Sequence, residues 1–346
     1  MFETAELNPD RPEDRMITVF LNRDCPRTCY QCGIADNSRR SMPGDDWIQA
    51  LVNLKKVFDP TFILFLGVEP LLLRGAMVMI VEWLRDNDMQ AGWYTTSPEP
   101  LFSEWCHRLH AAGINNWSSG IDTLPHLDSL DPVTDKKARE SIIGLQWMAA
   151  RGVDTHITTT IHKKNLHLVP QILEWCWENI PNVECAVNFI EWRKEPGFDF
   201  FSPPEDMADM LWDGSLEEKA VVRLIMDKVW KASQKPNRRF HTAETYLKHA
   251  HEFYLRLNLH CQGAIGPSVD ADGTMRLCGY HTGKEVKNYN VLNIDLTPEL
   301  FKEDWETDLA ACSGCYWACF TLPSALMHHH NHPLNRRPLI LPTSEG

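Results

Sequence analysis

Three cysteines near the start of the chain point most directly to chemistry. Cys25, Cys29 and Cys32 follow a short apolar run at residues 16–21, with three and then two residues between successive cysteines. Thiolates are soft ligands that suit iron–sulfur centres, and three of them can bind three irons of a cubane cluster. The fourth iron then lacks a protein ligand. As at an open catalytic metal site, this vacancy leaves room for a cofactor or a substrate.

Two other interpretations of the cysteine loop stay open. A zinc site needs a fourth Cys or His, and residues 1–106 contain no histidine, so that ligand would have to come from a distant segment. A disulfide with one free thiol is typical of secreted chains. Residues 1–14, however, are acidic and polar and contain no apolar stretch, so no signal peptide is predicted. An iron–sulfur cluster is therefore the favoured interpretation.

The spacing of these cysteines resembles the signature of the radical S-adenosylmethionine (radical SAM) superfamily. That family usually has an aromatic residue just before the third cysteine, whereas Gln31 stands here and Tyr30 comes one residue earlier. The resemblance implies a [4Fe-4S] cluster bound to Cys25, Cys29 and Cys32, with SAM chelating the open iron. It also implies that one electron, from a donor such as flavodoxin or ferredoxin, cleaves SAM to a 5′-deoxyadenosyl radical that abstracts a hydrogen atom.

Composition narrows the class of protein. The chain has 346 residues, enough for one large domain with a small appendage. A net charge of −13 argues against nucleic-acid binding, and no run of about 20 apolar residues predicts a membrane span. Eleven cysteines without a visible secretion signal indicate metal binding in a reducing, cytoplasmic compartment.

The pattern of apolar residues predicts an α/β fold. Residues 61–66 are nearly all apolar, as in a strand buried on both faces, and residues 45–57 have the apolar stripe of a helix. Alternating strands and helices imply a parallel sheet with helical crossovers. We predict a partial (β/α)6 TIM-like barrel, also the fold of the family, with chemistry at the C-terminal strand ends. Further strands are predicted at 91–95, 115–121, 154–161 and 183–189, and helices at 71–84, 101–111, 136–150 and 166–178.

The chain divides into five predicted segments. An N-terminal extension over 1–15 precedes the barrel over 16–200. Polar, helix-length stretches then predict a helical bridge over 201–258, with helices at 206–212, 216–232 and 242–257. A small auxiliary-cluster domain over 259–322 and a tail over 323–346 follow. The tail contains a histidine-rich run that we interpret as solvated.

Several strand-end motifs in the barrel also resemble the family. Gly67, Val68, Glu69 and Pro70 resemble a Gly-Gly-Glu-Pro segment that contacts the amino group of SAM, an ammonium that requires acceptors. Further residues at the ends of the predicted strands have two alternative explanations. They could cap the next helix, or belong to a β-branched strand with a solvated basic end. The resemblance implies SAM contacts by Thr96, Ser119, Asp122, Thr158, Thr160 and Lys164.

A second set of cysteines occurs near the C-terminus: Cys261, Cys278, Cys312 and Cys315. Residues 270–278 predict a β-hairpin with an Asp-Gly turn, ending at Cys278. The set resembles the shortened auxiliary domain called Twitch, a reduced SPASM domain, which implies a hairpin-plus-helix subdomain holding one auxiliary [4Fe-4S] cluster. A structural zinc ribbon is the alternative. Cys319 is a candidate catalytic hydrogen-atom donor, an alternative ligand, or an ordinary buried thiol.

The resemblance implies an enzyme that abstracts hydrogen from an unactivated carbon. Only 24 residues precede Cys25, too few for a leader-binding domain, so we expect a small polar natural-product-like substrate. Dehydrogenation, epimerisation or decarboxylation would be the outcome, with the auxiliary cluster assisting. The first alternative is a maturase that modifies a ribosomally made peptide or protein. A non-catalytic metal-binding protein is the remote alternative.

Overall fold

The computed structural model describes residues 17–29, 32, 41–60, 62–66, 68–127, 131–190, 209–210, 215–242, 244, 246–248, 267–276, 288–293, 297 and 303–304. Within these residues a single sheet runs in the order β10-β9-β8-β1-β2-β3-β4-β5-β6-β7, and its two ends do not pair. The first six strands are parallel neighbours in chain order, so the predicted partial barrel is confirmed. They are β1 (Ile17–Val19), β2 (Phe62–Leu66), β3 (Gln90–Tyr94), β4 (Asn116–Gly120), β5 (Asp154–Ile161) and β6 (Glu184–Phe189).

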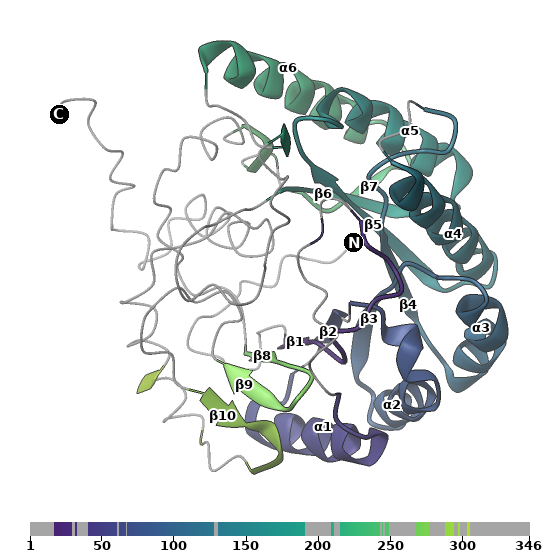
Figure 1. The fold of residues 1–346 in the computed structure, drawn as a ribbon, viewed down its shortest axis with the longest axis vertical. Coiled ribbons are helices and arrows are strands. Elements are labelled where there is room, and N and C mark those ends of the chain that lie inside the picture. The colour runs from purple at the N-terminus through teal and green to yellow at the C-terminus, as the bar shows by residue number, and fades with distance from the viewer. Residues whose placement is uncertain are drawn as a thin grey trace.

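Helices connect these strands and cover the outer face of the curved sheet (Figure 1). The helix between β1 and β2 buries four residues whose spacing forms one apolar stripe: Trp47, Ala50, Leu51 and Leu54. The helix before β4 ends at Gly113, whose φ of 102° is the left-handed conformation of a C-terminal capping glycine. The crossover helices are α1 (Gly44–Phe58), α2 (Arg74–Asp86), α3 (Leu101–Ala112), α4 (Pro132–Ala149) and α5 (Val169–Asn179), with 3-10 turns at Pro70–Leu73 and Leu166–Leu168.

Two helices differ from the predicted bounds for local reasons. The helix predicted from residue 71 starts as a 3-10 turn, because Pro70 opens it and the Glu69 side chain accepts from the Leu71 amide. Helix α4 begins four residues before its predicted start. The Asp131 carboxylate there accepts hydrogen bonds from the backbone amides of Val133 and Thr134, and Pro132 occupies the first turn.

The region predicted as a helical bridge contains the helix predicted at 216–232, and a further strand of the sheet follows that helix. Helix α6 (Leu216–Ser233) packs against α5, and β7 (Arg239–Phe240) pairs in parallel with β6. The apolar face of α6, with Val222, Met226 and Val229 buried, needs such a partner to leave water. The sheet therefore reaches past the predicted boundary at residue 200. Most of the helix predicted at 206–212 and most of the one predicted at 242–257 lie outside the described residues.

The predicted C-terminal hairpin is present and joins the barrel. Strands β8 (Ser268–Val269) and β9 (Thr274–Arg276) are antiparallel, and Gly273 in the turn between them has a φ of 84°. Strand β8 also pairs in parallel with β1, which the sequence did not predict. Strand β10 (Asn288–Asn290) extends the sheet beyond β9. Cys261, Cys278, Cys312, Cys315 and Cys319 lie outside the described residues.

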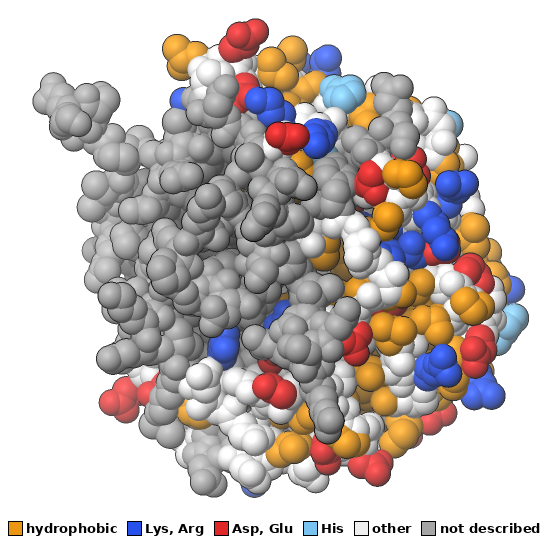
Figure 2. All heavy atoms as spheres, in the orientation of Figure 1, with side chains coloured by type: hydrophobic (Ala, Val, Ile, Leu, Met, Phe, Trp, Pro, Cys, Tyr) orange, Lys and Arg blue, Asp and Glu red, His pale blue; other side chains and the backbone are white. Residues whose placement is uncertain are grey.

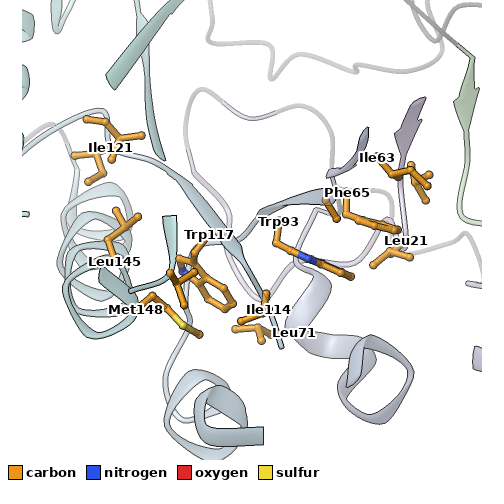
Figure 3. Close-up of a cluster of buried hydrophobic side chains, with 14 of the residues drawn as sticks. Leu21, Ile63, Phe65, Leu71, Trp93, Ile114, Trp117, Ile121, Leu145 and Met148 are labelled. Carbon is orange, nitrogen blue, oxygen red and sulfur yellow. The ribbon is translucent and has the colours of Figure 1, made fainter. Parts of the chain in front are cut away.

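The core fills the space between the sheet and the helices. Phe65 of β2 and Trp93 of β3 stack with ring centroids 4.2 Å apart, and Trp117 of β4 faces Leu145 and Met148 of α4 (Figure 3). Fully buried aromatic rings of this size each remove about 150–250 Å² from water. They hold β2, β3 and β4 rigidly, so the residues at the ends of these strands have fixed positions.

The surface of the described part carries both signs of charge. Acidic and basic side chains are interspersed over the helical layer in the view of Figure 2. Among the described residues, none of the helices combines the length and the apolar character that crossing a membrane requires.

Candidate active site

The cysteine loop, residues 25–32, begins just after β1, at the C-terminal edge of the parallel sheet. Cys25 and Cys29 are half-buried, Cys32 is exposed, and all three are free thiols. The Cys32 amide donates to the Cys29 carbonyl at 3.0 Å, forming a tight turn. Burial is the main cause that raises the pKa of Cys25 to about 12 and that of Cys29 to about 11, with smaller contributions from neighbouring negative groups. Three free thiols therefore lie within one short loop after β1.

The donor set of this loop fits an iron–sulfur cluster. Within the described part of the chain, no three His, Cys, Asp or Glu side chains converge on a point where a single metal ion would bind. A cubane cluster needs no such convergence, because each thiolate binds a different iron. Three free thiols with no disulfide between them can serve as those ligands once metal binding displaces their protons.

Next to this loop lies a network at the ends of β2 and β3, which we call the Glu69 network: Asn22, Glu69, Thr95 and Thr96. The Glu69 carboxylate is fully buried. One oxygen accepts from Thr95 Oγ1 at 2.6 Å and from the Leu71 amide at 3.2 Å. The other accepts from the Thr96 amide at 2.9 Å and from Thr96 Oγ1 at 2.7 Å. Asn22 Nδ2 donates to the Glu69 carbonyl at 2.7 Å, which ties in the end of β1.

The Glu69 carboxylate is occupied by the chain itself. A carboxylate offers about four acceptor positions, and four donors from the protein fill them. Burial raises the pKa of Glu69, and these hydrogen bonds oppose that rise. The carboxylate therefore fixes the spacing of β2 and β3. This arrangement does not favour the predicted direct contact of the Glu69 side chain with the SAM amino group. Gly67 lies outside the described residues, and Pro70 is buried at the start of the 3-10 turn.

A second network surrounds Asp122, just after β4. Asp122 accepts from the Thr160 amide at 2.9 Å and from Lys137 Nζ at 2.7 Å, and its carbonyl accepts from Asn165 Nδ2 at 3.1 Å. The Lys137 side chain, from α4, is only 12% exposed, whereas that of Lys136 is 68% exposed. A Cβ at Gly120 would lie 3.0 Å from Lys137 Nζ, so the glycine leaves room for the ammonium against the strand.

Lys137 is held as an ammonium near the cysteine loop. Burial lowers the pKa of Lys137, but the Asp122 carboxylate outweighs that effect and raises it above its usual range. The positive charge of Lys137 in turn partly offsets the raised pKa of Cys29. The Lys137 ammonium therefore interacts electrostatically with both Asp122 after β4 and Cys29 in the cysteine loop.

The remaining predicted SAM contacts fall on different faces. Thr158 and Thr160 share the face of β5 opposite the buried Ile157, as alternation predicted, and lie across from Gly120 and Asn188 in register. Ser119 lies across from Ile157, on the helix-covered face, where its hydroxyl is buried and makes no hydrogen bond within the described residues. Lys164 is exposed and pairs with Asp209 at 3.6 Å. Ser119 therefore does not share the face of the sheet that carries Thr158.

Sequence reasoning missed Asn22, Arg27, Thr95 and Lys137. The first two flank Cys25 in the loop, and Thr95 directly precedes Thr96, so position in the chain was a signal for all three. Nothing in the sequence separates Lys137 from Lys136, since only the packing of α4 decides which of them is buried.

Comparison with known proteins gives one sequence relative and several structural ones. No protein-family profile matches the chain. The chain is 24% identical over 177 residues to the AdoMet-dependent heme synthase of Nitratidesulfovibrio vulgaris, a match that covers 49% of this chain. It spans about half, 47%, of the length of that relative.

Two solved enzymes share the fold. SuiB of Streptococcus suis, bound to S-adenosylmethionine, superposes with a TM-score of 0.58 at 16% identity, over 81% of this chain and 64% of SuiB. The enzyme anSMEcpe, bound to AdoMet and a peptide, superposes with a TM-score of 0.53 at 12% identity, over 83% of this chain and 79% of anSMEcpe. The partial barrel described above is thus the barrel of these SAM-binding enzymes.

Proposed function

We propose that this chain is a radical SAM superfamily enzyme that binds SAM and abstracts a hydrogen atom from its substrate; the shared fold and the sequence similarity to an AdoMet-dependent enzyme support this. Cys25, Cys29 and Cys32 would hold a [4Fe-4S] cluster. When bound, that cluster supplies the electron that cleaves SAM. The observation that carries the proposal is the position of three free thiols at the C-terminal strand ends, beside two preformed polar networks.

The residues around the loop have defined tasks in this proposal. Lys137 carries a fixed ammonium and three N–H donors, of which one bond goes to Asp122, so it suits a carboxylate such as that of SAM. Thr158 and Thr160 carry hydroxyls on the face of β5 that the helices do not cover. These hydroxyls could form hydrogen bonds with the ribose of SAM. Asp122 orients both Lys137 and the Thr160 amide. The Glu69 network keeps the adjoining strand ends in place.

The first candidate substrate is a small polar molecule, since the partly exposed face of β5 and β6 carries polar side chains such as Thr158, Thr160 and Asn188. A peptide is the second candidate, and a specific observation favours it: SuiB has been solved with its precursor peptide SuiA, and anSMEcpe with a peptide. The proposal retains an auxiliary [4Fe-4S] cluster on Cys261, Cys278, Cys312 and Cys315, a donor role for Cys319, and a flavodoxin or ferredoxin as electron source.

Anaerobic reconstitution with iron and sulfide tests the proposal. Wild-type protein should bind iron, absorb broadly in the visible range and convert SAM to 5′-deoxyadenosine under reduction. Cys25→Ala, Cys29→Ala and Cys32→Ala should abolish that product, whereas Cys106→Ala, a buried thiol of α3, should not. Product formed by any of the three loop variants contradicts the assignment.

The metal content separates the forms of the C-terminal site. About eight irons per chain would match two [4Fe-4S] clusters, whereas about four irons with one zinc would make the C-terminal site a zinc site. Zinc alone would overturn the enzyme proposal.

A further inference from the structure

We propose that Arg27, inside the cysteine loop, is a positioning residue that fixes the loop against the Glu69 network and against helix α4. The inference rests on the proposed function for its effect on SAM. Its structural part, the anchoring of the loop, can be tested on protein without metal.

The Arg27 side chain leaves the loop between Cys25 and Cys29 and is 9% exposed. Its Nε donates to Thr96 Oγ1 at 2.9 Å. Its terminal nitrogen forms an ion pair with Glu140 of α4, which is 8% exposed. Arg27 thus connects three separate elements: the loop after β1, the end of β3, and the middle of α4.

The hydrogen bonds of this connection have a fixed direction. A threonine hydroxyl has one proton, and Thr96 gives it to Glu69 at 2.7 Å. Thr96 can therefore only accept from Arg27, and a guanidinium can only donate. Reversing the direction of either hydrogen bond between Arg27, Thr96 and Glu69 would leave a polar group without a partner. Since the Arg27 guanidinium is always charged, its bond to Thr96 belongs to the stronger, charge-assisted class.

Burial explains why two partners are needed. A guanidinium is rarely buried unless it is paired, and Glu140 provides the opposite charge at the far end of the side chain. Loops after strands are usually the most variable part of such a barrel. Here the loop is pinned at its centre, between two of its cysteines. Through Thr96, the Arg27 side chain connects the loop to the Glu69 carboxylate, which sets the spacing of β2 and β3.

The contacts of Arg27 should affect how tightly a ligand binds. A molecule that touches both the cysteine loop and the strand ends binds well only if the distance between them is fixed. If the loop must instead be ordered when the ligand binds, part of the binding free energy is lost in ordering it. Loss of the Arg27 contacts should therefore leave the three thiols able to bind iron but weaken the binding of SAM.

The test compares Arg27→Gln, Glu140→Gln and the double variant, with Arg85→Gln as control, since Arg85 forms an exposed pair with Asp86. In metal-free protein, mass spectrometry follows the alkylation rates of Cys25 and Cys29. Both Arg27→Gln and Glu140→Gln should raise these rates several-fold. The buried Cys106, Cys176 and Cys185 serve as internal controls and should not change.

The reconstituted protein provides the second readout. Arg27→Gln and Glu140→Gln should bind wild-type amounts of iron but bind SAM about tenfold more weakly, measured by equilibrium dialysis. SAM should also change the electron paramagnetic resonance spectrum of the reduced cluster less than in wild type. The double variant should be no worse than Arg27→Gln, because residues that share one contact are not additive. Arg27→Lys should restore part of the affinity.

Several outcomes would overturn the proposal. They are unchanged alkylation in Arg27→Gln, faster alkylation of the three control cysteines together with Cys25 and Cys29, or additive effects in the double variant. If Arg27→Gln fails to fold, Glu140→Gln carries the test, since it changes no loop residue and keeps the size of the side chain. If wild-type protein binds no iron or leaves SAM intact, the proposed function fails, while the alkylation rates still decide whether Arg27 anchors the loop.

Discussion

Replacing Asp270 with alanine should destabilise the barrel as a whole, although Asp270 lies in the turn of the C-terminal hairpin. Arg23, just after β1, donates from Nε to Asp270 Oδ1 at 2.7 Å and from Nη2 to Oδ2 at 2.9 Å. The two side chains are 2% and 7% exposed. This paired, two-bond geometry is the strong form of an arginine–carboxylate contact. It connects segments 247 residues apart in the sequence.

The expected loss follows from the burial of both charges. Removing one member of a buried ion pair costs about 3–5 kcal/mol, because the other charge stays in a medium of low dielectric constant. Asp270 Oδ1 also accepts from the Ala271 amide, a bond of about 1 kcal/mol. Arg23 cannot easily turn to water, since its guanidinium lies 4.6 Å from the centre of the Phe20 ring. The loss is a large part of the roughly 5–15 kcal/mol that stabilises a typical domain.

Urea unfolding of metal-free protein under reducing conditions, followed by tryptophan fluorescence, measures this loss. Asp86→Ala is the matched control, because the pair of Asp86 with Arg85 is exposed and should contribute about 0–1 kcal/mol. A loss below about 1 kcal/mol for Asp270→Ala would refute the argument, since a buried pair should cost more. A separate early transition of the hairpin, with the main transition unchanged, would refute the claim that the hairpin belongs to the barrel.

Two further predictions concern stability. Burial lowers the pKa of His162 to about 4, so its neutral form contributes stability above about pH 6.5 that is lost as the pH falls towards 4. The loss should reach about 3 kcal/mol in urea titrations and shrink in His162→Gln; equal pH slopes would contradict this assignment. Gly144→Ala should lower the melting temperature, since its Cβ would lie 2.1 Å from Ser97 Oγ, at a cost of about 1–3 kcal/mol. Gly75→Ala, with nothing within 4 Å, should be neutral or stabilising by about 1 kcal/mol, so shifts of the same sign and size would count against the packing argument.

Local patterns were enough to predict the strands and helices of the barrel. Strand β5 matches its predicted bounds, residues 154–161, because six of its eight residues are β-branched, which favours a strand. The pairing of β8 with β1 has no such signal, since it joins segments about 250 residues apart in one short ladder. The same holds for Arg23 and Asp270, whose partnership depends on that ladder.

The candidate site could be predicted in part. The cysteine loop and the strand-end positions of Glu69, Thr96 and Asp122 follow from motifs that lie next to predicted strands. Ser119 differs from these residues, because alternation along β4 places its side chain on the opposite face from Gly120. Counting back by twos from Asp122 puts Ser118, not Ser119, on the interior face, as the register with β5 shows.

The two strand-end carboxylates suggest how this site is built. Glu69 and Asp122 both resemble ligand-contacting residues in sequence, yet each accepts hydrogen bonds from its own chain. Their oxygens hold Thr96 and the Thr160 amide in place and orient the Lys137 ammonium. A site arranged in this way is ordered before any ligand arrives, so less binding energy is lost in ordering it. The Gly-x-Glu-Pro segment then acts through the spacing of β2 and β3, and Val68 at the variable position leaves that function intact because the carboxylate bonds do not involve its side chain.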